Sequence, residues 1–138
     1  MRLGHNQKID LIRKVPLFSR LSKPELRDLA MLADEIDLRD GKEMTRQGHP
    51  GREFFVLLEG TADVRKNGRK INSLGPGDFF GEIGMLDRGP ATATVVTDGP
   101  VEAMVLSHTQ FRDAIKANDN LALQVIAAMA KRLAPETL

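Results

Sequence analysis

Apolar side chains recur at the three- and four-residue spacing of a helix within residues 6–33, with an interruption at Pro16. The second of the two resulting helices is expected to start at Ser22, because a serine followed three residues later by Glu25 is the pattern of an N-terminal capping box. This helix should bury one face against the rest of the domain. The face consists of Leu26, Leu29, Ala30 and Ala33.

After Asp34 the pattern changes to short apolar stretches that Gly, Pro and Asn separate about every eight to twelve residues, which is typical of strands and turns. Asn67 and Gly68 lie between two such stretches, and both tolerate the positive φ of a two-residue type I′ hairpin turn. Many short antiparallel strands predict a mainly β domain with flanking helices. Its centre is expected to be an antiparallel β-roll, similar to a jelly roll, over residues 34–107.

Individual strands of this region are predicted from their boundaries. Phe54–Leu58 is predicted to be a buried strand that is followed by a tight turn at Glu59-Gly60. The stretches 91–97 and 101–106 are predicted to be two further strands, which are joined at Asp98-Gly99-Pro100.

Helical spacing returns in residues 108–134, where Asn118-Asp119-Asn120 supplies candidate N-caps for the last helix. Between Leu121 and Ala130 the only polar residue is Gln124, so this helix lacks a polar face. One interpretation is burial on two sides, with the roll on one side and a second protomer on the other. The alternative is that the alanines only raise helix propensity at a solvated surface.

Composition restricts the protein to one small domain, residues 1–138, with 41% hydrophobic and 28% charged residues. A formal net charge of +1 gives no general attraction to nucleic acid or anionic lipid, and the absence of cysteine excludes disulfides and thiolate metal sites. The sequence has no signal-peptide pattern and no apolar run long enough to span a membrane. We therefore expect a cytoplasmic protein that does not bind membranes.

The segment Leu74–Leu86 contains the strongest candidate for chemistry. It combines a Gly-Pro-Gly turn, the aromatic pair Phe79-Phe80 and small residues where a short helix could begin. A helix start exposes free N–H groups with partial positive charge and so attracts phosphate. The carboxylate of Glu82 is unsuited to phosphate but suited to accept hydrogen bonds from sugar hydroxyls. The aromatic pair is expected to anchor the roll rather than to stack on a base.

Two segments, Phe80–Leu86 and Arg88–Val95, resemble the phosphate-binding cassette of cyclic-nucleotide-binding domains. This family includes sensor domains of bacterial catabolite-activator-type regulators, protein kinase regulatory subunits and cyclic-nucleotide-gated channels. The resemblance extends over nearly the whole chain, and it implies a regulatory sensor that has no enzymatic activity and needs no cofactor or metal. Further matching segments are Val15–Phe18, Gly41, Gly48–Gly60 and Met129–Leu133.

The resemblance implies a ligand site for cAMP, in preference to cGMP. Gly81 and Glu82 match the positions that bind the ribose. Ile83, Gly84 and Thr92 are expected near the cyclic phosphate. The family's phosphate-binding arginine should follow Pro90, but the residue there is Ala91, which predicts weakened binding.

Three explanations of Ala91 stay open at this point. The site can be naturally degenerate, it can have been altered deliberately, or Arg88 can reach the phosphate from the preceding loop. We favour loss of the arginine, because Arg88 beside a Gly-Pro pair is typical of a solvated loop residue. Thr92 is equally compatible with a phosphate contact and with an ordinary strand position.

Other functions find less support in the sequence. A cupin enzyme needs clustered metal ligands, whereas His5, His49 and His108 are isolated. A serine hydrolase would need a Gly-x-Ser-x-Gly elbow, and a transcription factor would need a DNA-binding domain after the last helix, so DNA binding by this chain is not expected. An interaction domain that no longer binds nucleotide is the main alternative. The output is expected through a homodimer at residues 120–133 or through an effector domain outside this chain.

Overall fold

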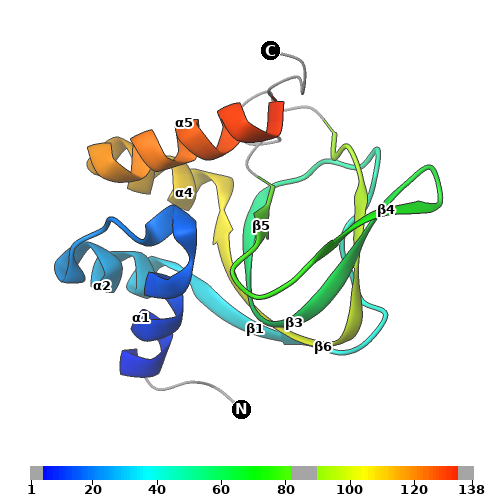
Figure 1. Ribbon diagram of the computed structural model, residues 1–138, viewed down its shortest axis with the longest axis horizontal. Helices are drawn as coiled ribbons and strands as arrows, with labels where there is room; N and C mark the ends of the chain where they lie inside the picture. The colour runs from blue at the N-terminus through cyan, green and yellow to red at the C-terminus, as the bar shows by residue number, and fades with distance from the viewer. Residues whose placement is uncertain (1–4, 82–89, 134–138) are drawn as a thin grey trace.

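The fold is described by a computed structural model in which residues 5–81 and 90–133 are defined. The N-terminal helices are α1 (His5–Lys14), the 3₁₀ turn η1 (Pro16–Phe18) and α2 (Lys23–Leu32). The capping box predicted at Ser22 is present, since the Ser22 hydroxyl accepts from the Glu25 N–H at 3.3 Å and the Glu25 carboxylate accepts from the Ser22 N–H at 2.8 Å. The helices gather at one side of the strands (Figure 1).

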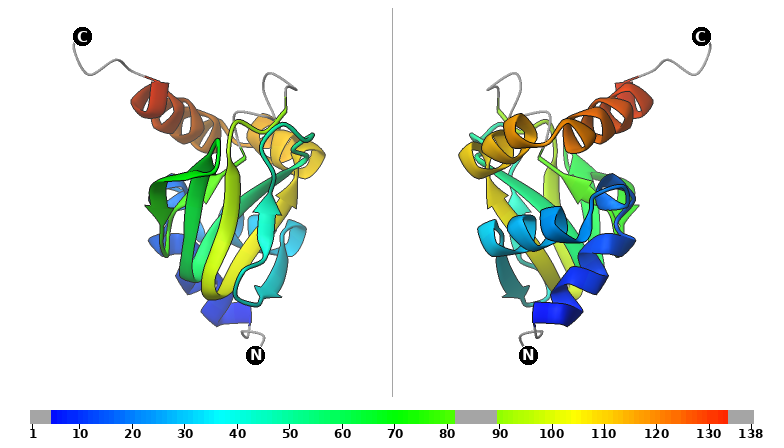
Figure 2. Two further views of the ribbon diagram at one scale, coloured as in Figure 1. Left: turned by 90° about the vertical axis from the view of Figure 1, so that its right-hand side faces the viewer. Right: turned by 90° about the vertical axis from the view of Figure 1, so that its left-hand side faces the viewer.

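Six antiparallel strands form one curved sheet, which confirms the predicted β-roll with flanking helices. The hydrogen-bonded order is β1-β6-β3-β4, while β2 also pairs with β6 and β5 with β3. Figure 2 shows how the strands curl around the interior of the roll while the helices stay outside. The strands are β1 (Asp34–Leu38), β2 (Glu43–Thr45), β3 (Glu53–Lys66), β4 (Arg69–Leu74), β5 (Phe79–Phe80) and β6 (Thr94–Ser107).

The two longest strands, β3 and β6, continue past the turns that were predicted at Glu59-Gly60 and Asp98-Gly99-Pro100. Gly60 lies inside β3 with φ +88°, and Gly99 lies inside β6 with φ +85°, so neither glycine ends a strand. The pairing of β3 with β6 shifts register around Glu59, which marks an irregularity in the ladder. A Cβ on Gly60 would overlap the Pro100 carbonyl oxygen, so the two backbones approach closely here. The glycines bend two long strands together instead of reversing the chain.

The predicted hairpin turn is present. Asn67 has φ 53° and Gly68 has φ 80°, as a type I′ turn between β3 and β4 requires. The Gln47 side chain holds this turn from the β2–β3 connection, because its amide nitrogen donates to the Asn67 side chain at 3.0 Å and its oxygen accepts from the Asn67 N–H at 2.8 Å.

The sheet separates two hydrophobic clusters. The larger one lies between the sheet and the helices, where Phe54 stacks on Phe111 with ring centroids 4.0 Å apart. The smaller one lies inside the roll and includes Leu57, Ala62 and Leu74. Alternation along β3 supplies both clusters, since successive side chains point to opposite faces.

The C-terminal helices are α4 (His108–Ala117) and α5 (Asp119–Leu133). Asn118 joins them, since its side chain accepts from the Leu121 N–H at 3.0 Å and donates to the Glu25 carboxylate of the N-terminal helices. On α5, Leu121 and Val125 are buried. In contrast, Leu123 and Ile126 are 61% and 62% exposed, so this chain covers only one side of the helix.

No helix in the described part of the chain combines the length and the apolar composition that crossing a membrane requires.

Candidate functional site

A cavity of about 340 Å³ opens inside the roll, near the point where β5 ends and β6 approaches. Its volume is at the lower end of the range for small-molecule sites, which is roughly 300 to 1,000 Å³. Three predicted site residues, Gly81, Ala91 and Thr92, line this one cavity although ten positions separate the first two in the sequence. Glu82, Ile83, Gly84 and Arg88 were also predicted at the site, and they lie outside the described residues.

Gly81 occupies a position that only glycine can take. Its φ of +101° is in the region that side chains with a Cβ rarely adopt, and an added Cβ would overlap the Glu53 carbonyl oxygen of β3. The backbone of Gly81 is therefore pressed against the first residues of β3, at the edge of the cavity. This close approach fixes the backbone at the end of β5 against the start of β3.

Ala91 is held by the backbone of the β2–β3 connection. Its N–H donates to the His49 carbonyl at 2.9 Å, and its carbonyl accepts from the Gly48 N–H at 2.9 Å. The preceding residue, Pro90, forms an isolated antiparallel bridge with Pro50. These contacts anchor Ala91 at the cavity wall, where its methyl group leaves the adjoining space open.

The two threonines that follow differ in their roles. Thr92 is exposed, lines the cavity and lies outside the helices and strands, two residues before β6 begins. Thr94 begins β6, and its hydroxyl accepts from the Gln47 N–H at 2.9 Å. Thr92 is thus the hydroxyl of this pair that is available to a ligand, whereas Thr94 fastens β6 to the β2–β3 connection.

Polar residues that the sequence did not suggest also line the cavity, namely Thr45 of β2, Glu53 of β3 and Asn72 of β4. Strand alternation could have indicated Asn72, because it shares a face of β4 with Leu74, the only buried residue of that strand. Glu53 gives no such signal, because its place at the cavity depends on a pairing between distant strands. Phe79 and Phe80 pack against the two core clusters, as expected, and both also line the cavity.

The described lining is short of positive charge. Glu53 is its one charged residue, and neither lysine nor arginine contributes to the part of the cavity wall that is defined. A phosphate in this cavity would therefore depend on backbone N–H groups and hydroxyls for its described contacts. Within residues 5–81 and 90–133, no cluster of three or more histidine, aspartate or glutamate side chains could hold a metal ion.

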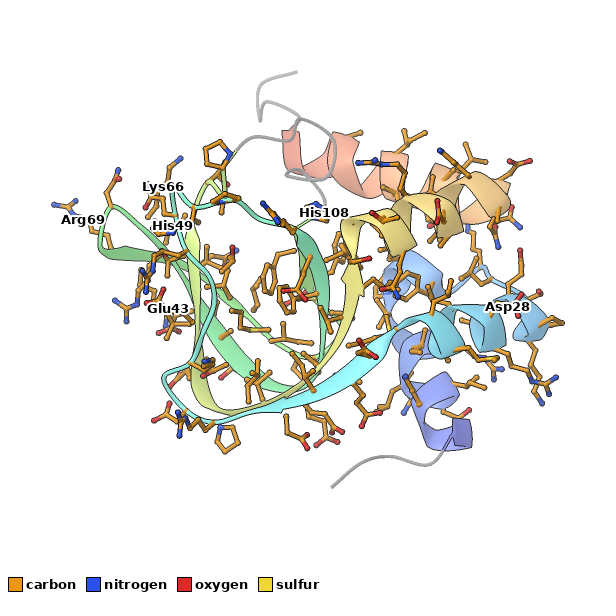
Figure 3. All side chains as sticks on the ribbon, turned by 180° about the vertical axis from the view of Figure 1, so that it is seen from behind. Asp28, Glu43, His49, Lys66, Arg69 and His108 are labelled. Carbon is orange, nitrogen blue, oxygen red and sulfur yellow. The ribbon has the colours of Figure 1, made fainter. Side chains whose placement is uncertain are left out.

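His108 lies directly behind Gly81. Its Nε2 is 3.0 Å from the Gly81 carbonyl oxygen, and the side chain is half-buried at the start of α4. Burial is the main cause that lowers the pKa of His108, and hydrogen bonds to the backbone of Gly81 and Glu53 oppose it. Figure 3 shows His108 near the start of α4, with His49 on the other side of the roll.

Comparison with known proteins gives the arrangement a context. The chain matches the family described as the cyclic nucleotide-binding domain over residues 35–118. It is 39% identical over 95 residues to a cAMP-dependent protein kinase regulatory subunit from Mycosarcoma maydis, a match that covers 64% of this chain and 18% of the relative. It is 33% identical over 130 residues to the cGMP-dependent protein kinase egl-4 from Caenorhabditis briggsae, with 87% of this chain and 17% of the relative covered.

A solved structure shares the fold. It is a mutant regulatory subunit of a cAMP-independent protein kinase A from Trypanosoma brucei, bound to cAMP in the A site, with a TM-score of 0.78 and 24% sequence identity. The match covers 91% of this chain and 47% of that one, and one of the mutations replaces a threonine by arginine. The chain spans less than a fifth of the length of the two curated relatives.

Proposed function

This chain belongs to the cyclic nucleotide-binding domain family, and we propose that it is a sensor for cAMP whose affinity is reduced because Ala91 replaces a phosphate-binding arginine. The observation that carries the proposal is the joint placement of Gly81, Ala91 and Thr92 along one cavity of ligand size. In this proposal the domain has regulatory activity and performs no catalysis.

The proposed binding mode uses the whole cassette. The ribose lies at Gly81 and Glu82, where the carboxylate accepts from the 2′-hydroxyl, and the phosphate lies near Ile83, Gly84 and the 91–92 segment. Support comes from the glycine-only backbone at position 81 and from the exposed Thr92 hydroxyl on the cavity wall. The base then occupies the space in front of the apolar lining of the roll, which is provided by Val64, Leu74, Phe80 and Val95.

The loss of the arginine sets the expected strength of binding. A charge-assisted hydrogen bond in a partly buried site is worth about 1.5 to 3 kcal/mol, or roughly ten- to a hundredfold in affinity. The described lining offers no other cation in its place. We propose that Arg88 does not compensate.

The preference for cAMP over cGMP rests on the comparisons. Of the two curated relatives, the cAMP-dependent regulatory subunit has the higher identity, at 39% against 33% for the cGMP-dependent kinase. The two nucleotides differ in the base alone, so discrimination depends on polar groups near the base. Asn72 is such a group, because its amide carries both donors and an acceptor at the cavity wall.

The output of the sensor is proposed to pass through α5. The exposed Leu123 and Ile126 give this helix an apolar outer face that a homodimer partner or an effector domain would cover. The proposed location is the cytoplasm.

A second candidate function is an interaction domain that keeps the roll and no longer binds nucleotide. Ala91 favours it, since the residue that would pair with the phosphate charge is missing from the described wall. The two candidates differ in one property, which is whether a cyclic nucleotide occupies the cavity at all.

An NMR titration of the chain separates the candidates. We expect cAMP at millimolar concentration to shift the amide signals of Gly81, Ala91 and Thr92 while the hairpin turn at Asn67-Gly68 stays unchanged. Glu82→Ala should weaken the response, and 5′-AMP should reproduce it poorly. If neither cAMP nor cGMP shifts the amide signals of the cavity residues, the sensor function is excluded and the interaction domain is favoured.

A further inference from the structure

His108 joins three segments of the chain behind the cavity. Its backbone N–H donates to the Arg52 carbonyl at 2.9 Å, next to the first residue of β3. Its ring reaches past Glu53 to the carbonyl of Gly81, at a distance of 3.0 Å from Nε2. One residue therefore links the start of α4, the start of β3 and the end of β5.

The chemistry of this contact defines the state of the ring. A carbonyl oxygen can only accept, so Nε2 of His108 must carry the proton that is donated to Gly81. Burial favours the neutral ring, and Arg112 one turn along α4 also lowers the pKa of His108. The backbone hydrogen bonds to Gly81 and Glu53 and the Glu53 carboxylate act in the opposite direction. The neutral Nε2–H tautomer satisfies the Gly81 carbonyl without burying a charge.

Both ends of this hydrogen bond are rigidly placed. Gly81 is pressed against the Glu53 carbonyl, with a backbone conformation that only glycine adopts readily. At the other end, the Ser107 hydroxyl accepts from the Gln110 N–H at 3.1 Å, so the first turn of α4 is fixed by a capping box. The same helix inserts Phe111 against Phe54 in the core. Gly81 cannot shift without either breaking the bond to His108 or moving the first turn of α4.

We propose that His108 is a positioning residue that couples nucleotide binding at Gly81 to the orientation of α4 and α5. This inference rests on the proposed function, because it assigns a route for the signal of that same site. Ligand contacts at Gly81 would favour one placement of its carbonyl, and the hydrogen bond would pass this preference to α4. The relay is a direct bond between the edge of the cavity and the helix pair that carries the exposed apolar face.

The test compares two substitutions that differ in the donor. His108→Gln keeps an N–H donor near the place of Nε2, whereas His108→Leu removes the donor and keeps a side chain of moderate size. Thr109→Leu is the matched control, because Thr109 is the exposed neighbour on the same turn and lies outside the cavity lining. The readouts are cAMP affinity by NMR titration, hydrogen exchange of α4 and α5 with and without cAMP, and the ¹⁵N shifts of the imidazole, which report the tautomer.

We expect His108→Leu to bind cAMP about three- to tenfold more weakly, the worth of one hydrogen bond, and to lose the cAMP-dependent change in exchange along α4 and α5. His108→Gln and Thr109→Leu should keep both properties, and the wild-type imidazole should show a proton on Nε2. Thermal unfolding identifies any variant that is not folded, and the rescue by Gln is then decisive because both substitutions remove the ring.

Two results would overturn the inference in distinguishable ways. If the wild type binds cAMP and His108→Leu transmits the signal to α5 as well as His108→Gln does, the coupling role fails while the proposed function stands. If the wild-type cavity does not respond to cAMP, the proposed function fails and the coupling role fails with it.

Discussion

A group of carboxylates on the sheet predicts an unusual dependence of stability on pH. Glu102 of β6 lies opposite Asp37 of β1 and Glu59 of β3 in the strand registers. A hydrogen bond that the protonated Glu102 carboxyl donates to the Glu35 carboxylate is the main cause that raises the pKa of Glu102 to about 7, followed by burial and by the nearby negative charges. Its buried Oε1 finds no hydrogen-bond partner among residues 5–81 and 90–133.

The size of the effect follows from linkage. The pKa of the Glu102 carboxyl is raised from 4.5 in the unfolded chain to about 7 in the folded protein. Between these two pH values the folded protein keeps a proton on Glu102 that the unfolded chain has released. The corresponding stability is complete below pH 4.5 and is lost as the pH rises through about 7. At ~1.4 kcal/mol per pH unit the limit is about 3 kcal/mol, and solvent screening reduces it to about 1 to 2 kcal/mol.

Replacement of the carboxyl tests this reasoning. Glu102→Gln should match the wild type in free energy of unfolding at pH 5 and exceed it by about 1 to 2 kcal/mol at pH 8, because the amide never ionises. Urea unfolding at pH 5, 6, 7 and 8 measures the difference, and Asp98→Asn on the same strand is the control. A difference between Glu102→Gln and wild type that does not change with pH would refute the account.

Two further predictions concern the helices. Asn118→Ala should lower the free energy of unfolding by about 1 to 2 kcal/mol in urea melts, since it removes both the cap of α5 and the bond to Glu25; Asn120→Ala, at an exposed position, should cost much less, and equal losses would show that the cap is unimportant. If the exposed face of α5 is a dimer interface, the wild type should sediment as a dimer and Ile126→Lys should sediment as a monomer. Interfaces of micromolar affinity are populated at roughly 100 μM. A wild type that sediments as a monomer at about that concentration would refute the proposed dimer.

Local patterns in the sequence were sufficient for most of the fold. The capping box at Ser22 and the turn at Asn67-Gly68 are present because each depends only on residues a few positions apart. The predicted ends of the strands at Gly60 and Gly99 were wrong for a physical reason. Gly60 and Gly99 have the positive φ that a turn would require, but their strands continue, because each keeps pairing with the other beyond the bend. Whether a glycine ends a strand in a turn or bends a strand that continues depends on the pairing with the partner strand.

The candidate site was also predictable only in part. Gly81, Ala91 and Thr92 were predicted as site residues because the resemblance to a family names their positions, and all three line one cavity in the structure. His108 gave no signal of its own, since its importance comes from a hydrogen bond to a residue 27 positions away. Contacts of this kind depend on how the roll closes, which hydrophobic periodicity does not encode.

The central claim, that a cyclic nucleotide binds in this cavity with its phosphate at Ala91, is tested most directly by calorimetric titration of cAMP into the wild type and into Ala91→Arg. The account predicts weak binding by the wild type and an affinity that is about ten- to a hundredfold higher in Ala91→Arg, from one restored charge-assisted contact. Equal affinities, or no binding by either form, would contradict it.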